Sequence, residues 1–146
     1  MQIDEMIFDC RGPAITESAI VRIERELDVR FPQDYREFLL RHNGGLSQLC
    51  VSSDRSIGMW DWLSVDAEKE VYDLLTCNKR LRRDHGTEYL IIALDLAQSY
   101  ILMRVVPPRV GAIGMLEWEV GDTIENLKLA FFSFTDFVAH LHHEPL

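Results

Sequence analysis

The first clear hydrophobic pattern along the chain covers residues 16–27. Ile20, Ile23 and Leu27 fall on one face of a helix, while arginine and glutamate side chains occupy the opposite face. Thr16 stands directly before the first turn, where its hydroxyl can accept a hydrogen bond from an exposed backbone N–H. This stretch is therefore predicted to form an amphipathic helix.

A second helical pattern follows in the segment FPQDYREFLLRHNGG, residues 31–45. One face carries the side chains that recur at steps of three and four residues: Tyr35, Phe38, Leu39 and His42. Pro32 suits the first helical position, where its missing N–H has no partner to lose. Gly44 or Gly45 can supply the left-handed residue that ends a helix. With only a short connection between them, the two helices are predicted to form a helical hairpin.

The rest of the chain alternates between strand and helix patterns. Runs of β-branched and aromatic residues predict strands over residues 46–53, 56–64, 88–95, 99–106 and 112–120. Residues 65–81 return to a helical period, with Gly86 closing the helix, and the apolar face is made by Val71, Leu74, Leu75 and Leu81. A last helix is predicted after Ser133, with a buried stripe of Phe134, Phe137, Val138 and Leu141.

This order of elements predicts the fold class. A helix pair, then strands, a helix, more strands and a final helix indicate an α+β protein. We expect a twisted, mainly antiparallel sheet packed by helices, with the helical hairpin at the N-terminal side and one helix at the C-terminal side. The 146 residues contain no repeat, linker or low-complexity tract, so a single domain is predicted over residues 1–146.

Charge and composition narrow the class of partner. The chain is 47% hydrophobic and 27% charged, as is usual for a globular domain, and its formal net charge is −9. Such a negative surface repels phosphate backbones, which argues against direct binding of nucleic acid. The same surface attracts a basic protein.

Localisation and cofactors follow from what the sequence lacks. The start, MQIDEMIFD, has acids where a secretory signal needs basic and apolar regions, and Asp95 and Arg104 interrupt the longest apolar runs. Neither a membrane span nor a targeting segment is predicted, so a cytoplasmic protein is expected. The three cysteines are widely spaced and form no Cys-x-x-Cys pair, which argues against a disulfide framework or a zinc site.

Candidate catalytic and metal-binding groups have simpler interpretations. His140 and His143 share a helical spacing that could bind a metal, but histidines near a helix end also interact favourably with its dipole. Glu24 and Asp34 could act as paired carboxylates, yet no nucleophile or anion cradle accompanies them, and charge on a helix surface is the favoured interpretation. No catalytic, cofactor or metal residue is predicted, and the protein is expected not to be an enzyme.

The candidate partner-binding residues are tryptophans and acids. Trp60 and Trp62 are two residues apart, so on a strand both would point to one face, with Asp61 on the other. They suit either a core or a binding hot spot. Trp118, between two glutamates, repeats the pattern. The predicted partner-binding set is Trp60, Asp61, Trp62, Glu68, Glu70, Asp73, Glu117, Trp118 and Glu119.

The helical hairpin also carries a combination of motifs. These are Glu24, Phe31-Pro32, Asp34-Tyr35, Phe38-Leu39 and Asn43-Gly44. The combination resembles the SUKH superfamily, the Smi/Knr-type proteins. Downstream, LIIALD, GAIGMLEWE and SFTDFVAHL resemble the later strands and closing helix of that family. The resemblance runs from about residue 15 to residue 141.

The resemblance implies a function by binding. Bacterial members of the superfamily are associated with immunity to toxins, which they bind and block, and fungal relatives regulate cell-wall synthesis through protein contacts. The residues of the motif would then stabilise the fold and not take part in chemistry. They are Glu24, Pro32, Tyr35, Phe38, Asn43, Gly44 and Gly45. The expected function is that of an immunity protein that neutralises a cognate toxin domain, for which a basic, nuclease-like domain is a natural partner. The alternative is a regulatory adaptor like the fungal relatives.

Overall fold

The computed structural model describes residues 1–117 and 123–145. Within these residues, seven strands neighbour one another in sequence order. They are β1 (Phe8–Arg11), β2 (Gly45–Ser52), β3 (Gly58–Trp62), β4 (Tyr89–Asp95), β5 (Tyr100–Arg104), β6 (Ile113–Leu116) and β7 (Leu129–Phe131). An eighth strand, β8 (Leu141–His143), pairs with β2 beyond the point where β1 ends. All these pairs are antiparallel.

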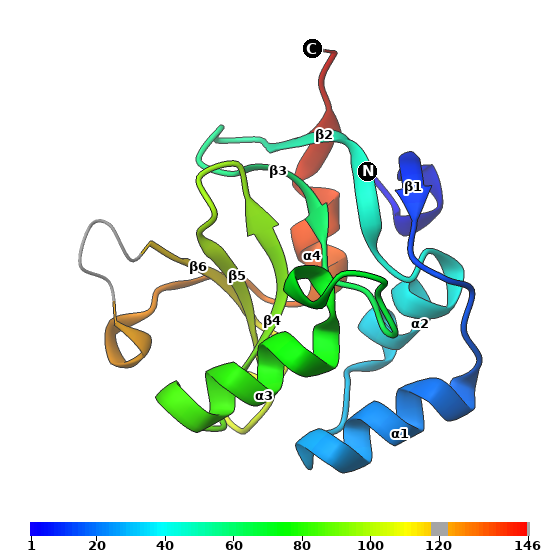
Figure 1. Cartoon of the computed structure of the whole chain (residues 1–146). Coiled ribbons are helices and arrows are strands. Elements are labelled where there is room, and N and C mark those ends of the chain that lie inside the picture. The colour runs from blue at the N-terminus through cyan, green and yellow to red at the C-terminus, as the bar shows by residue number, and fades with distance from the viewer. Residues whose placement is uncertain (118–122, 146) are drawn as a thin grey trace.

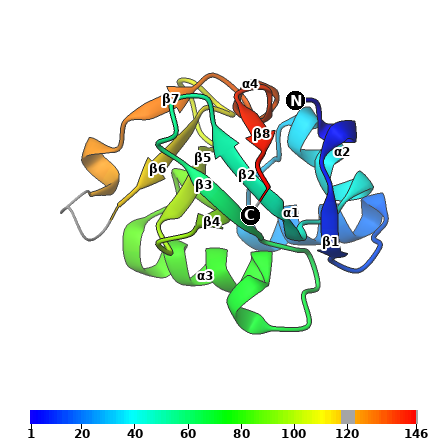
Figure 2. The ribbon, with the colours of Figure 1, turned by 90° about the horizontal axis from the view of Figure 1, so that it is seen from above.

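Helices pack on both sides of this sheet (Figure 1; Figure 2). The described residues form α1 (Glu17–Leu27), α2 (Gln33–Arg41), α3 (Leu74–His85) and α4 (Phe134–Ala139), with short 3₁₀ turns η1 (Ile3–Glu5), η2 (Glu70–Tyr72) and η4 (Ile124–Asn126). Helix α3 packs against β4 and α1, and α2 packs against α4. All seven residues of β4 are buried, which requires cover on both faces because successive side chains point to opposite sides. The predicted α+β fold, with a mainly antiparallel sheet, is confirmed.

The helical hairpin packs its predicted face into an aromatic core. Tyr35, Phe38 and Leu39 of α2 are fully buried, and Ile20, Ile23 and Leu27 of α1 are buried as well. Around Phe38 lie the rings of Tyr35, Trp62 and Phe134, with centroids 6.1, 5.2 and 4.9 Å away. Aromatic rings at these separations attract one another beyond the effect of burial alone. This core holds the hairpin, β3 and α4 together.

The ends of α2 differ in detail from the prediction. Pro32 is the N-cap residue rather than the first helical residue, since the helix begins at Gln33. At the other end, Asn43, with φ of 43°, is the first left-handed residue, and its N–H donates to the Leu39 carbonyl. Asn43 therefore ends the helix, because asparagine tolerates this conformation. Gly44 and Gly45 follow Asn43 and are not the residues that end the helix.

The predicted helix over residues 65–81 is also corrected, because α3 begins only at Leu74. Asp73 is its N-cap, with a side-chain oxygen that accepts from the Thr76 N–H at 3.0 Å. The residues before it form η2, which turns Val71 outward until it is 61% exposed. Gly86 does close the helix as predicted.

Three short strands were not predicted from the sequence. Strands β1, β7 and β8 have three or four residues each, too few for an alternating pattern to be distinctive. The last helix ends at Ala139, so Leu141 is buried from β8 rather than from a helix. His140 and His143 therefore do not lie in one helix, and the helical spacing read from the sequence is wrong.

Candidate partner-binding groove

The most distinctive irregularity of the sheet lies between β2 and its neighbour β3. Leu46 pairs with Asp61 and Cys50 pairs with Met59, so that Ser47, Gln48 and Leu49 stand opposite Trp60 alone. On its other side, β3 has Trp60 as an extra residue against β4. Such bulges redirect side chains and are frequent beside functional sites.

The bulge at Trp60 corrects the prediction for the two tryptophans. Met59 and Trp62, three residues apart, are both buried in the core, whereas Trp60 and Asp61 between them are only partly buried. Strict alternation would have placed Trp60 and Trp62 on the same face, and the bulge separates them. Trp62 packs against Phe38 and α4, and its indole N–H donates to the Ser47 hydroxyl at 3.1 Å. Trp62 is a core residue.

Trp60 and Asp61 instead line an open groove of about 670 Å³. The residues around it come from β1, β2, β3, η2 and the end of the described chain. Its walls are Asp9, Leu46, Ser47, Gln48, Leu49, Trp60, Asp61, Tyr72, Glu144 and Pro145. Two aromatic residues and three acidic residues thus line one hollow. We call it the β2–β3 groove.

The carboxylate of Asp61 has no partner among the residues that the structure describes. It is partly buried, and neither a hydrogen bond nor an ion pair reaches it within that part of the chain. Burial raises the pKa of Asp61 above its usual value, because the charged form loses contact with water. Glu144, in contrast, is paired with Arg55 and lies 3.2 Å from the His142 ring. These contacts hold the pKa of Glu144 below its usual range.

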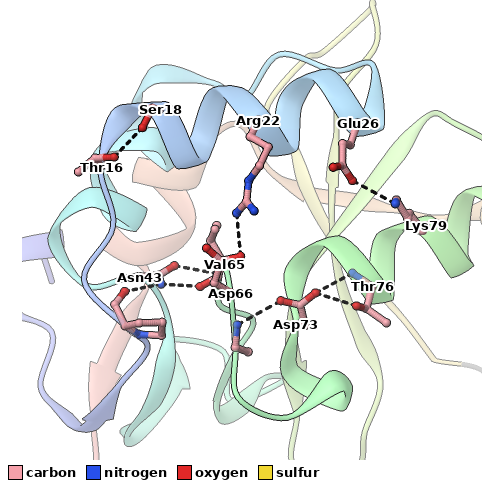
Figure 3. Close-up of polar contacts among 12 residues, drawn as sticks. Thr16, Ser18, Arg22, Glu26, Asn43, Val65, Asp66, Asp73, Thr76 and Lys79 are labelled. Carbon is pink, nitrogen blue, oxygen red and sulfur yellow. Dashed lines mark hydrogen bonds and ion pairs between the residues drawn. The ribbon is translucent and has the colours of Figure 1, made fainter.

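The other predicted acids fall in different places. Glu68 and Glu70 are exposed on the segment that leads to Tyr72 of the groove wall. Asp73 accepts hydrogen bonds from the Ala67 N–H and from Thr76, so it holds the start of α3 (Figure 3). Because that carboxylate is structural, reversing its charge would disturb the helix itself.

The third predicted cluster lies away from the groove. Glu117 follows β6, three strands away from β3, and is partly buried. Trp118 and Glu119 lie outside the described residues. The structure therefore brings together Trp60 and Asp61, with Glu68 and Glu70 on the adjoining segment, and separates Glu117 from them.

The polar residues of the hairpin motif join elements to one another. Glu24 of α1 accepts from the Phe31 N–H at 2.7 Å and forms an ion pair with Arg36 of α2. Asp34 accepts from both the N–H and the hydroxyl of Thr135, at 2.9 Å each, and so caps α4 from α2. Both carboxylates serve helix contacts, which favours the structural interpretation over acid–base chemistry.

Asn43 performs a similar role at the end of α2. Its side chain is buried, donates to the carbonyls of Pro13 and Val65, and accepts from the Val65 N–H at 2.8 Å (Figure 3). The same region carries ion pairs from α1 to its surroundings, between Arg22 and Asp66 and between Glu26 and Lys79. The bonds to Val65 and Asp66 hold the segment between β3 and α3 that carries Tyr72, and the pair at Lys79 joins α1 to α3.

His42 secures β1, which carries Asp9 into the groove. Its ring stacks on Phe8 with centroids 4.8 Å apart, Nδ1 accepts from Arg11 at 3.2 Å, and Nε2 therefore holds the proton and donates to the Ile3 carbonyl at 2.9 Å. Burial lowers the pKa of His42, and the nearby charges of Arg11 and Arg41 lower it further against the opposing effects of the Ile3 carbonyl and Asp4.

This environment predicts a loss of stability in mild acid. Since the folded-state pKa of His42 lies below the unfolded value of about 6.5, its contribution is complete above that pH and is lost as the pH falls below it. The free energy of unfolding, measured by urea denaturation between pH 7.5 and 5, should decline, and His42→Gln should flatten that decline. His85→Gln, at an exposed position in α3, is the matched control. If the free energy of unfolding falls equally with pH in wild type and in His42→Gln, this account is contradicted.

Several groove residues were not found from the sequence. Asp9 lies in an unpredicted strand, Glu144 and Pro145 follow another, and Leu46 and Tyr72 had been assigned to a strand and a helix without a binding role. The local signal in the sequence was the combination of aromatic and acidic residues around Trp60. No group of three or more His, Cys, Asp or Glu side chains suited to a metal ion occurs in the described ranges. Within the same ranges, every helix is too short or too polar to cross a membrane.

A second hollow, of about 710 Å³, runs beside α1 and α2. Its acids Glu17 and Glu24 are both paired with Arg36, and Phe31, the one aromatic residue in its lining, is buried in the core, whereas Trp60 and Tyr72 of the β2–β3 groove are only partly buried. This difference makes the β2–β3 groove the stronger candidate for binding.

A comparison with protein families matches most of the chain. Residues 14–140 match the model of the SMI1 / KNR4 family (SUKH-1). The match begins just before α1 and extends past α4. No curated protein shows significant sequence similarity to the chain.

Proposed function

The chain belongs to the SMI1/KNR4 family (SUKH-1), which includes toxin immunity proteins, and we propose that it is such a protein. In this proposal it binds a cognate bacterial toxin domain directly and blocks it without chemistry of its own. The family is generally non-catalytic, and the carboxylates Glu24 and Asp34 are engaged in helix contacts.

The β2–β3 groove is the observation that supports binding at a defined surface. Trp60 and Tyr72 offer the side chains most enriched at binding hot spots, and they are only partly buried in the free protein. Asp61 has no partner among the described residues, although burial disfavours its charge. A cation supplied by a partner would stabilise the charged carboxylate of Asp61. The groove would therefore be more stable in a complex than in the free protein.

The overall charge supports a basic partner. The net charge is −9, and Glu68 and Glu70 add exposed negative charge next to the groove wall. Toxin domains that act on nucleic acid need positive surfaces to bind phosphates. An acidic inhibitor would be attracted to that surface, and such steering raises association rates by about 10 to 10³.

The test is protection against a toxin domain encoded next to this protein. Wild type should bind that domain and restore growth of cells that express it. Trp60→Ala should weaken binding by about 2 kcal/mol or more, as expected for a hot spot, and lose protection. Affinity is measured by isothermal titration calorimetry, and thermal melts establish that each variant is folded.

Phe132→Ala is the matched control, because Phe132 is an aromatic residue that is 79% exposed and lies outside the groove. It should bind and protect like wild type. Full protection by Trp60→Ala would place the interface elsewhere. A folded wild type that does not bind the neighbouring toxin would overturn the immunity role and favour the adaptor.

A further inference from the structure

We infer that the β2–β3 groove takes an arginine side chain of the partner, with the guanidinium against Trp60 and the carboxylate of Asp61. This inference rests on the proposed function for the identity of the partner, and it specifies the chemistry that the same site recognises.

The first reason is the pairing state of the carboxylates. Of the three that line the groove, Glu144 is already engaged by Arg55. Asp9 and Asp61 have neither an ion pair nor a side-chain hydrogen bond within the part of the chain that the structure describes. Asp9 is exposed on β1 while Asp61 is partly buried on β3, so the two carboxylates approach the groove from different strands. Two such carboxylates in one groove favour the binding of a cation that another molecule supplies.

The second reason is the aromatic component. Trp60 and Tyr72 line the same groove, and a cation over an aromatic face is attracted by its electron-rich surface. Arginine suits this combination better than lysine. Its planar guanidinium can stack on a ring and still direct N–H groups in its plane to a carboxylate, whereas the ammonium of lysine is compact and strongly hydrated.

The third reason is the apolar part of the wall. Leu46, Leu49 and Pro145 line the groove together with the acids. The aliphatic stem of a long basic side chain can lie along such a surface while its charged end reaches the carboxylates. The volume of about 670 Å³ leaves room for the neighbouring backbone of the partner as well.

The experiment uses a capped tripeptide, acetyl-Gly-Arg-Gly-amide, and follows the Trp60 indole N–H by NMR. The signal is assigned from its loss in Trp60→Phe. The arginine peptide should shift it in a saturable way. The lysine counterpart should bind several-fold more weakly, and the citrulline counterpart, which has nearly the same shape without the charge, should not shift it.

The matched variants are Asp61→Asn and Glu125→Gln, which change the net charge equally. Glu125 is exposed on η4 and outside the groove. Asp61→Asn should weaken binding of the arginine peptide about tenfold, since it removes a charge-assisted hydrogen bond. Glu125→Gln should change it less than twofold. Equal effects of the two variants, or equal binding of arginine and citrulline peptides, would overturn the inference.

The two proposals fail in different ways. If the neighbouring toxin domain binds through Trp60 but the arginine peptide does not bind, the arginine inference is wrong and the immunity role stands. If the peptide binds in the groove while the toxin domain is not recognised, the immunity role is wrong and the groove still selects arginine.

Discussion

Phe38→Ala is expected to lower the free energy of unfolding by about 3–5 kcal/mol, because it removes a buried ring and leaves a cavity that its neighbours cannot fill. Phe38 is fully buried, and the ring centroids around it lie at 4.9–6.2 Å, those of Phe8, Tyr35, Trp62 and Phe134. Since these rings come from β1, α2, β3 and α4, the loss affects the contact between the hairpin and the sheet. Denaturation in urea measures the change.

Tyr35 provides a paired experiment on the same core. Tyr35→Ala should cost a similar amount, since this side chain is also fully buried. Its hydroxyl, however, has no hydrogen-bond partner in the described residues, and burial raises the pKa of this phenol far above its usual value. An unsatisfied buried hydroxyl is costly, so Tyr35→Phe should be neutral or stabilising by about 1 kcal/mol.

The contrast between the two Tyr35 variants is the critical measurement. A large loss in Tyr35→Phe would show that the hydroxyl contributes to stability. A melt in which neither Tyr35→Ala nor Phe38→Ala loses stability would contradict the assignment of this helix face to the core.

The second large effect is expected at Gly44 and Gly45. Both have positive φ, 67° and 106°, which side chains rarely adopt. A Cβ at Gly44 would lie 2.2 Å from the Leu63 carbonyl oxygen, and one at Gly45 would lie 2.1 Å from that of Cys10. Backbone strain and steric overlap add together here, so replacing both by alanine should cost at least about 3 kcal/mol, and each single change at least about 2 kcal/mol.

Gly86→Ala separates the two causes. Gly86 also has a positive φ, 92°, but a Cβ there would meet nothing within 4 Å. With a ψ of −171°, Gly86 lies in a region that side chains rarely adopt, so the variant should show only the conformational cost, about 1–3 kcal/mol. If Gly44→Ala and Gly45→Ala are no worse than Gly86→Ala, the close approach of β1 and of the segment after β3 is not what requires glycine.

The helical hairpin and most of the central strands could be predicted from the sequence. The apolar faces of α1 and α2 repeat every three or four residues within a short window, and this period persists in the structure because burial of that stripe is what stabilises each helix. The cap at Ser133 was also predictable, since its hydroxyl bonds the Asp136 N–H only three residues away. The motif residues of the hairpin also lie close together in the sequence, and their combination indicated the family.

The β2–β3 groove could not be predicted from the sequence, because it depends on contacts between distant segments. Whether Trp60 and Trp62 share a face depends on a bulge, which exists only relative to the neighbouring strands β2 and β4. Asp9 and Glu144 lie near opposite ends of the chain, and both enter the groove because β1 and β8 pair with β2. Local periodicity records which side chains prefer burial, whereas strand pairing between distant segments decides which of the remaining side chains meet at a surface.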